Sequence, residues 1–236
     1  MSLSLFHCER PFMRLFLFAL ALASSAHADT LETDLLIVGG NESGCAAAVQ
    51  AARLGVRRIA LVNDIAWLGG QFSSEGVGPV DERTAIKGKS VNFPRSGLFL
   101  EMVRSIRAYN SQTYGLSAPG NCWSATETIE PAAAEKLFER LLSPYLEDGS
   151  RQITLLRGWQ PTRVVCEGKR VAGVHFEQAA APGKVLCVRA RLTIDASDWG
   201  DVIRLSGAEH YAGVDPKSRF GEPGAPEVMD GEAHQE

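Results

Sequence analysis

Six residues close to the start of the chain have the types and spacing of a phosphate-binding turn: Gly39-Gly40-Asn41-Glu42-Ser43-Gly44. In the G-x-G-x-x-G template, the first glycine makes the tight bend and the second lets the backbone approach the pyrophosphate of a dinucleotide. The third lets the following helix pack on the preceding strand. Gly39 and Gly44 fill the outer positions, whereas Asn41 stands in the middle one. The segment predicts an anion site at a helix N-terminus. The alternative is an ordinary strand–helix connection without a ligand.

Asparagine in the middle position changes what the turn can do. Asn adopts the left-handed backbone region more readily than most residues, so Asn41 could preserve the bend. Its side-chain amide could also donate to a phosphate oxygen. Equally, a side chain at this position could crowd the ligand. The two possibilities lead to opposite expectations for affinity, and the sequence leaves both open.

A dinucleotide site also needs an acid about 20 residues further on, where the second strand ends, to accept hydrogen bonds from the ribose. Asn63 occupies that position and Asp64 follows it. Because successive strand residues point to opposite faces, Asp64 can take the ribose position only if the strand has ended before it. Asn63 can accept one hydrogen bond and donate another. We therefore expect it to bind ribose more weakly than an acid would.

The elements that must position these residues alternate between strand and helix. The apolar run 35–38 predicts a strand buried on both faces, and the alanine-rich segment 45–54 predicts a helix that Gly55 caps. Residues 58–62 predict a second strand. Together they form one βαβ unit. Residues 67–97 are rich in Gly, Ser and Pro, and they predict loops with short pieces of structure.

Two helices and five strands are predicted in the rest of the chain. Apolar residues at helical spacing predict one helix around Phe99–Ile106 and another that Pro131 opens and that ends near Leu142. The strands are predicted at residues 153–156, 163–166, 171–176, 185–188 and 192–195. The middle three predict an antiparallel meander, and the last predicts a return to the parallel sheet. From Asp215 onward no element is predicted. The fold class is therefore α/β, a parallel sheet with helices and a β-meander.

Composition and cysteine spacing exclude some classes of partner. The chain has 236 residues, with 24 Lys and Arg against 28 Asp and Glu, a net charge of −4. It lacks the basic surplus of a nucleic-acid binder. Four cysteines follow the first 28 residues, at spacings that match no zinc or iron–sulfur site, and we expect no metal: Cys45, Cys122, Cys166 and Cys187. The last two lie on neighbouring predicted strands. They could form a disulfide or remain buried free thiols.

The first 28 residues have the pattern of a secretory signal peptide. Basic residues precede the apolar run Leu15–Ala23, and Ala26-His27-Ala28 follows it as a small-x-small cleavage signal. The run is too short to span a bilayer core, which takes about 20 residues. We therefore expect a periplasmic or secreted chain that begins at Asp29 after cleavage and contains no membrane span.

Three separated motifs resemble one family. Ile59 to Gln71, ending Trp67-Leu68-Gly69-Gly70-Gln71, resembles the second strand and Gly-Gly loop of FAD-dependent oxidoreductases with the glutathione-reductase-like fold. Residues 194–201, Ile-Asp-Ala-Ser-Asp-Trp-Gly-Asp, resemble the later D-A-T/S-x-x-G-D segment of that group. With the glycine turn, these motifs are similar to the broad FAD-dependent oxidoreductase family whose members are often labelled heterodisulfide reductase-like. The resemblance covers about residues 33–226 and implies a Rossmann-like FAD/NAD(P)-binding fold.

The resemblance also implies positions around FAD. It places the glycine turn at the pyrophosphate, Asn63 with Asp64 at the ribose, and the Gly-Gly loop on the flavin side. The residues that it implies are Gly39, Gly40, Asn41, Ser43, Gly44, Asn63, Asp64, Gly69, Gly70, Gln71, Val164 near the adenine, and Ala196 with Ser197 where the chain re-enters the sheet. No residue is assigned a catalytic role, because a bound flavin performs its own redox chemistry.

Two hypotheses for function follow. In the first, residues 29–214 are the N-terminal portion of an FAD-binding domain that passes a hydride or electrons from a small-molecule substrate, and residues 215–236 are an irregular tail. In the second, the chain is a truncated, non-catalytic remnant of such a flavoprotein. In either case we expect a fold that is incomplete at the C-terminus, and a second chain could complete it. An NAD-binding domain is disfavoured by the Gly-Gly-Gln loop and the meander.

Overall fold

The computed structural model describes seven stretches of the chain: residues 29–80, 85–86, 89–90, 95–122, 125–146, 150–211 and 215–227. The expected signal peptide, residues 1–28, lies outside them.

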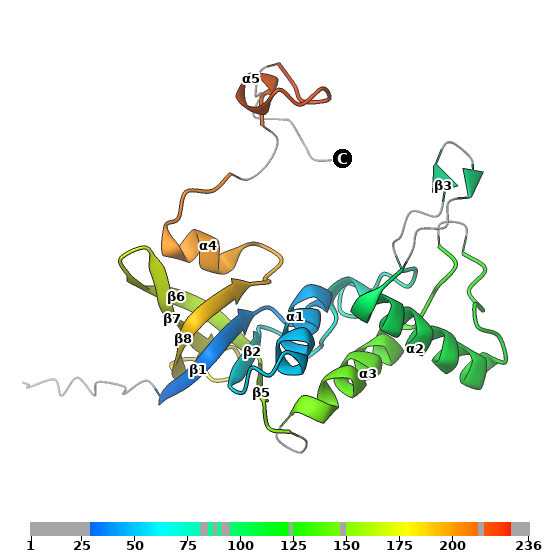
Figure 1. Ribbon diagram of the computed structural model, residues 1–236, viewed down its shortest axis with the longest axis horizontal. Coiled ribbons are helices and arrows are strands. Elements are labelled where there is room, and N and C mark those ends of the chain that lie inside the picture. Colours follow the sequence, from blue (N-terminus) through cyan, green and yellow to red (C-terminus); the bar gives the residue numbers. More distant parts are fainter. Residues whose placement is uncertain are drawn as a thin grey trace, which may run out of the picture.

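A six-stranded mixed sheet forms the body of the protein (Figure 1). Its strands, in spatial order, are β5 (Ile153–Arg157), β2 (Ile59–Asn63), β1 (Asp29–Val38), β8 (Val185–Asp195), β7 (Arg170–Gln178) and β6 (Trp159–Glu167). The first four run parallel to one another, and β8, β7 and β6 form an antiparallel meander. The predicted α/β class, with a parallel sheet and a meander, is confirmed.

The described residues form five helices. They are α1 (Glu42–Arg53), α2 (Gly97–Tyr114), α3 (Pro131–Leu142), α4 (Asp201–Ser206) and α5 (Lys217–Phe220), with 3-10 turns η1 (Gly70–Phe72) and η2 (Ser143–Tyr145). The first three lie where the sequence predicts helices, whereas α4 was not predicted. Two short strands, β3 (Ala85–Ile86) and β4 (Lys89–Ser90), form a hairpin in the segment predicted as loops. Pro131 opens α3, and Gly55, with φ +89°, follows the end of α1, as predicted.

Two apolar layers cover opposite faces of the sheet. Alternate residues of β1 point to opposite faces, so Leu35 and Ile37 pack in the core cluster that includes α1, α2 and α3 residues. Leu36 and Val38 pack in the second cluster with residues of the meander and of α4. β1 is therefore buried on both faces near its carboxyl end, as its unbroken apolar run predicts.

Several predicted details are wrong. Residues 185–188 and 192–195 belong to one continuous strand, β8, which pairs with β1 from Asp29 to Val38 as well as with β7. β1 thus starts well before residue 35. Phe99, expected in the buried stripe of its helix, is 38% exposed. The region after Asp215 contains the single-turn helix α5, which stands apart from the sheet (Figure 1).

No disulfide forms among the described cysteines; Cys187 is buried, whereas Cys166, expected to be buried as a free thiol, is exposed. Cys166 lies on β6 and Cys187 on β8, and β7 runs between these two strands. They are therefore not on adjacent strands, and the disulfide does not form.

Candidate functional site

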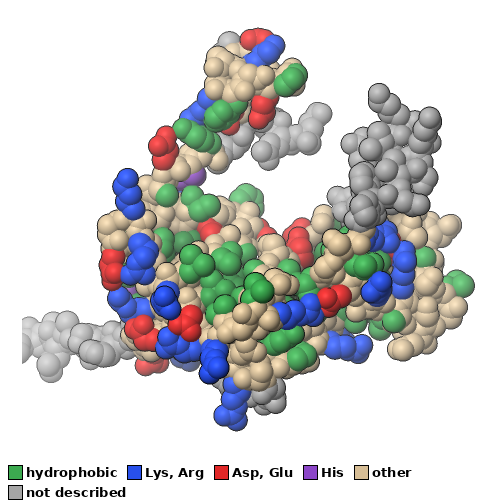
Figure 2. All heavy atoms as spheres, viewed as in Figure 1, with side chains coloured by type: hydrophobic (Ala, Val, Ile, Leu, Met, Phe, Trp, Pro, Cys, Tyr) green, Lys and Arg blue, Asp and Glu red, His purple; other side chains and the backbone are tan. Residues whose placement is uncertain are grey.

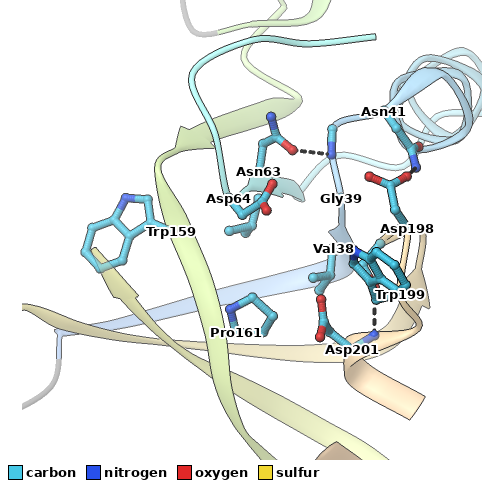
Figure 3. Close-up of a pocket in the computed structure, with 13 residues that line it drawn as sticks. Val38, Gly39, Asn41, Asn63, Asp64, Trp159, Pro161, Asp198, Trp199 and Asp201 are labelled. Carbon is cyan, nitrogen blue, oxygen red and sulfur yellow. Dashed lines mark hydrogen bonds between the residues drawn. The ribbon is translucent and has the colours of Figure 1, made fainter. Parts of the chain in front are cut away.

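A hollow of about 450 Å³, including its open mouth, lies where β1 and β2 end. β1 pairs on one side with β2, the next strand along the chain, and on the other with β8, which comes much later, so this edge is the switch point where α/β folds bind ligands. The lining residues are Val38, Gly39, Gly40, Asn41, Val62, Asn63, Asp64, Trp159, Pro161, Ser197, Asp198, Trp199 and Asp201. Figure 3 shows Asp64, Trp159 and Pro161 on one side of the Val38–Gly39 backbone, with Asn41, Asp198 and Trp199 on the other.

The outer glycines of the turn are required by the chain's own packing. Gly39 has φ +106°, and a Cβ there would collide with the carbonyl oxygen of Ala196. A Cβ at Gly44 would collide with the carbonyl oxygen of Gly39. These two residues therefore make the tight bend and the close helix–strand contact that the motif predicts. Gly40 is equally confined, because a Cβ there would come within 2.8 Å of the side chain of Leu68.

Asn41 caps α1 and ties the turn to the end of the sheet. Its backbone is extended, with φ −69° and ψ −174°, so the left-handed residue of the turn is Gly39 rather than Asn41. Asn41 Oδ1 accepts from Gly44 N at 3.0 Å. Its Nδ2 donates to Ala196 O at 2.7 Å and to Asp198 Oδ1 at 2.8 Å. Because both Nδ2 hydrogens are already donated, the amide is not free to donate to a phosphate in this arrangement.

The segment after β8 is organised by Asp195. Its Oδ1 accepts from the backbone and the hydroxyl of Ser197, and its Oδ2 accepts from Ile203 N at 2.9 Å. Ser197 Oγ in turn accepts from Asp201 N at 2.7 Å, at the start of α4. Ala196 N donates to Val38 O at 2.7 Å. The D-A-S-x-x-G-D segment is therefore held against the end of β1 and against the glycine turn.

Asn63 and Asp64 have different surroundings. Asn63 is 4% exposed; its Oδ1 accepts from Gly40 N at 2.7 Å, and its Nδ2 donates to Ile65 O and Trp67 O. Asn63 thus fixes two loops and has no free hydrogen left. β2 ends at Asn63, so the condition for Asp64 is met, and its exposed side chain lies at the hollow (Figure 3).

The other predicted residues lie away from this hollow. Gly69 packs against the Phe138 ring and Gly70 against the Glu42 carboxylate. Gln71 follows them in η1. Ser43 donates its hydroxyl to Asn41 Oδ1 at 2.7 Å. Val164 packs on the second core cluster, and β6 contributes Trp159 and Pro161 to the hollow in its place.

The charges around the hollow are acidic. Asp64, Asp198 and Asp201 line it, and none of its described lining residues is Lys, Arg or His. The first N–H groups of α1 have no partner within the helix and favour an anion. Beneath the turn, burial raises the pKa of the Cys45 thiol to about 12, and its Sγ donates to Gly40 O at 3.3 Å. The thiol is therefore protonated and contributes no charge.

The residues around the hollow suit some parts of FAD better than others. The lining includes apolar residues and the exposed acid Asp64, which follows β2 where the motif expects the ribose, and the N-terminus of α1 lies beside the hollow. The acidic lining opposes the pyrophosphate charge, and both asparagine side chains are engaged in bonds within the chain. The fit is thus good for adenosine and weaker for the phosphates.

Sequence reasoning did not assign seven of the residues that line the hollow to the site: Val38, Val62, Trp159, Pro161, Asp198, Trp199 and Asp201. It also did not assign Asp195. Asp195, Asp198 and Asp201 stand in the D-A-S-x-x-G-D motif, so the signal for them was present. For Trp159 and Pro161, the start of β6 was placed too late.

Neither a metal site nor a membrane span is found in the described stretches. No three His, Cys, Asp or Glu side chains among the described residues are grouped so that they could hold a metal ion. Within the same stretches, no helix is both long and apolar enough to cross a membrane.

The fold is an α/β fold of the Rossmann type with a hollow at its switch point. A family model described as FAD dependent oxidoreductase matches residues 34–235, and the chain belongs to that family. No curated protein sequence matches it.

Solved structures with similar folds include FAD enzymes. The myxobacterial chondrochloren halogenase CndH, an FAD-dependent halogenase, is 15% identical, with a TM-score of 0.43 over 71% of this chain and 37% of that chain. L-proline dehydrogenase from P. horikoshii is 14% identical, with a TM-score of 0.39 over 72% and 23%. Glycerol-3-phosphate dehydrogenase from Bacillus halodurans, solved with FAD, is 14% identical, with a TM-score of 0.46 over 73% and 36%. The chain thus spans well under half the length of each. Identities and TM-scores this low do not indicate a substrate or a partner for this chain.

Proposed function

We propose that the chain is the FAD-binding module of an oxidoreductase that passes a hydride or electrons from a small-molecule substrate to an acceptor. The observation that carries the proposal is the hollow at the carboxyl ends of β1 and β2, directly beside the N-terminus of α1. Family membership supports it, because members of the family depend on FAD.

Different residues of the chain would contact different parts of FAD. Asp64 would accept hydrogen bonds from the ribose, with Trp159 and Pro161 beside the adenosine. The first turn of α1 would hold the pyrophosphate, and Gly69 and Gly70 would border the flavin. When bound, FAD would supply the redox chemistry itself.

Titration of the purified chain with FAD tests the proposal. We expect quenching of flavin fluorescence. At a ligand concentration of about 100 times Kd, binding adds about 2.7 kcal/mol, which raises the Tm by roughly 5–10 °C for a chain of this size. Absence of both signals at high FAD concentration would reject FAD binding by the isolated chain.

One alternative is a non-catalytic remnant of such a flavoprotein. It is supported by the engagement of Asn41 and Asn63 in bonds within the chain, which leaves neither amide free for a cofactor. The FAD titration separates the alternatives. Binding of FAD would favour the module, whereas no binding at high FAD concentration would favour the remnant.

A further inference from the structure

The second half of β8 has a neighbouring strand on one side only. β1 pairs with β8 as far as Asp195, whereas β7 pairs with it only from Val185 to Arg189. Among the described residues, no other strand lies beside β8. From Ala190 onward β8 therefore has an open edge. The backbone groups of such an edge are a template for pairing with another chain.

Two residues of β7 explain where the open edge begins. A Cβ at Gly173 would come within 2.9 Å of Val188 O, so β7 approaches β8 closely at the point where their pairing ends. From there back to its start, β7 pairs only with β6. Arg170 Nη1 donates to Ala190 O at 3.1 Å, so a side chain rather than a strand contacts β8 there. The remaining residues, 191–195, are here called the β8 edge.

The β8 edge presents backbone groups and an exposed apolar side chain. Ala196 N donates to Val38 O. Because backbone groups alternate along a strand, those of Thr193 and Asp195 point away from β1. Leu192 is 62% exposed, although Leu35, its partner on β1, is buried. Figure 2 shows hydrophobic side chains exposed elsewhere too, between the sheet and the helices. Exposure of a leucine therefore does not mark a contact by itself, but an open strand edge beside it does.

The charges on the β8 edge are opposite at its two ends. Arg191 is exposed, and the acid that it influences, Asp34, is paired with Arg58 at 2.7 Å. At the other end, the Asp195 carboxylate accepts only from uncharged groups. Within the described part of the chain, neither Arg191 nor Asp195 forms an ion pair. Each charge is therefore available to a partner strand.

We propose that the β8 edge pairs with the β8 edge of a second copy of the chain, antiparallel about a twofold axis at Thr193. In this register Arg191 lies opposite the partner's Asp195, and Leu192 lies opposite the partner's Ile194. Two opposite-charge pairs and two apolar pairs result, and cross-strand pairs of both kinds stabilise sheets. A parallel arrangement would instead place Arg191 beside the partner's Arg191, which is unfavourable.

The backbone supports the same register. Thr193 lies opposite the partner's Thr193, so the groups that point away from β1 meet their counterparts, as an antiparallel ladder requires. The contact uses one patch on both copies, which is the commonest symmetry of homo-oligomers. The second chain that the sequence leads us to expect is then a second copy. This proposal does not rest on FAD binding.

Sedimentation equilibrium of the purified chain tests the dimer. We expect a monomer–dimer equilibrium. Arg191→Glu places like charges opposite each other and should raise the dissociation constant about tenfold. Arg57→Glu, the same change at an exposed residue outside β8, should leave it unchanged. Circular dichroism checks the folding of both variants. A monomer at every concentration, or equal dissociation constants for two folded variants, would overturn the proposal.

A cross-link tests the register without changing a charge. In a hydrogen-bonded antiparallel pair the Cα atoms lie about 5.5 Å apart, which a disulfide can bridge. With the exposed Cys166 replaced by Ser, oxidation of Thr193→Cys should link two copies through position 193, and peptide mass mapping identifies the link. Arg191→Cys in the same background should form no such link, because position 191 lies opposite position 195. Absence of the link at position 193, or a link at position 191, would reject the antiparallel dimer.

Discussion

The side-chain amide nitrogen of Asn41 lies 2.8 Å from Oδ1 of Asp198. This bond joins the glycine turn to the segment that follows β8, and it places a carboxylate beside the N-terminus of α1. That is where a helix dipole favours an anion. The chain therefore supplies its own negative group at this helix terminus.

Removal of that charge should tighten FAD binding. In Asp198→Asn, the side chain can still accept from Asn41, but the like charge near the phosphates is gone. We expect the Kd for FAD at low salt to fall by about threefold to tenfold, as for one unit charge a few ångströms away in a solvated site. Flavin fluorescence measures it. Glu222→Gln, an exposed acid in the tail, should leave the Kd unchanged. An unchanged or higher Kd in Asp198→Asn would mean that Asp198 does not oppose the cofactor.

The cap on α1 should contribute to stability. Asn41→Ala removes the cap and both bonds that Nδ2 donates, so we expect the free energy of unfolding to fall by about 1–2 kcal/mol. Asn41→Ser keeps an acceptor for Gly44 N and should lose less. Urea denaturation with circular dichroism measures both variants. Equal losses would show that the cap contributes nothing and that only the bonds from Nδ2 matter.

Substitutions of Asp64 and Asn63 should have different effects, the first on FAD binding and the second on stability. Asp64→Asn removes the exposed acid at the ribose position, so FAD should bind about tenfold more weakly, with stability changed by less than about 0.5 kcal/mol. Asn63→Ala leaves Gly40 N and two loop carbonyls without their partner, so it should lower the free energy of unfolding by about 2–3 kcal/mol. FAD titration and urea denaturation measure the pair. Full affinity in Asp64→Asn would assign the ribose elsewhere.

Stability should fall at alkaline pH because of Cys45. Burial raises the pKa of its thiol from 9.0 to about 12 in the folded chain. Between these pH values the unfolded chain loses the proton and the folded chain keeps it, so the free energy of unfolding decreases as the pH rises from 9 to 12. Urea denaturation across this range measures the slope. Cys45→Ala should flatten it, and a slope unchanged in that variant would assign the effect to other groups.

Export can be tested at the N-terminus. If residues 1–28 are a signal peptide, the protein recovered from the periplasm or the medium should begin at Asp29, the first residue of β1. Edman sequencing or intact mass gives the answer. Protein that retains the segment before Ala28, or that stays in the cytoplasm, would contradict export.

Much of the fold is readable from local pattern. The apolar run before Gly39, Pro131 at the start of α3 and Gly55 after α1 each act through nearby residues, so their elements were predicted correctly. β8 was divided in two because Arg189 and Arg191 interrupt its apolar residues. Its continuity depends on pairing with β1, which is a tertiary contact that no local window contains.

The sequence predicts several residues of the site, but it does not predict the hydrogen bonds that they form. The sequence places Asn41 and Asn63 in the positions that matter, yet it does not say which atoms are already engaged. Asn63 donates its amide hydrogens to Ile65 and Trp67, close by in sequence, while Asn41 bonds to Ala196 across the whole domain. These hydrogen bonds depend on how the chain packs. Because of them, the two amide groups that were expected to contact a ligand hold the chain together instead.

The pairing of β1 with β8 also sets an order for folding. Val38 of β1 pairs with Asp195 of β8, which lies 157 positions further along the chain, and the hydrogen bonds between these two strands must close a loop of that length. Contacts of such long range form slowly, because loop closure comes before any gain from pairing. β1 therefore has β2 as its only neighbouring strand until β8, which ends at Asp195, has been synthesised. Until then, the nascent chain carries a glycine turn without the segment that completes its binding site.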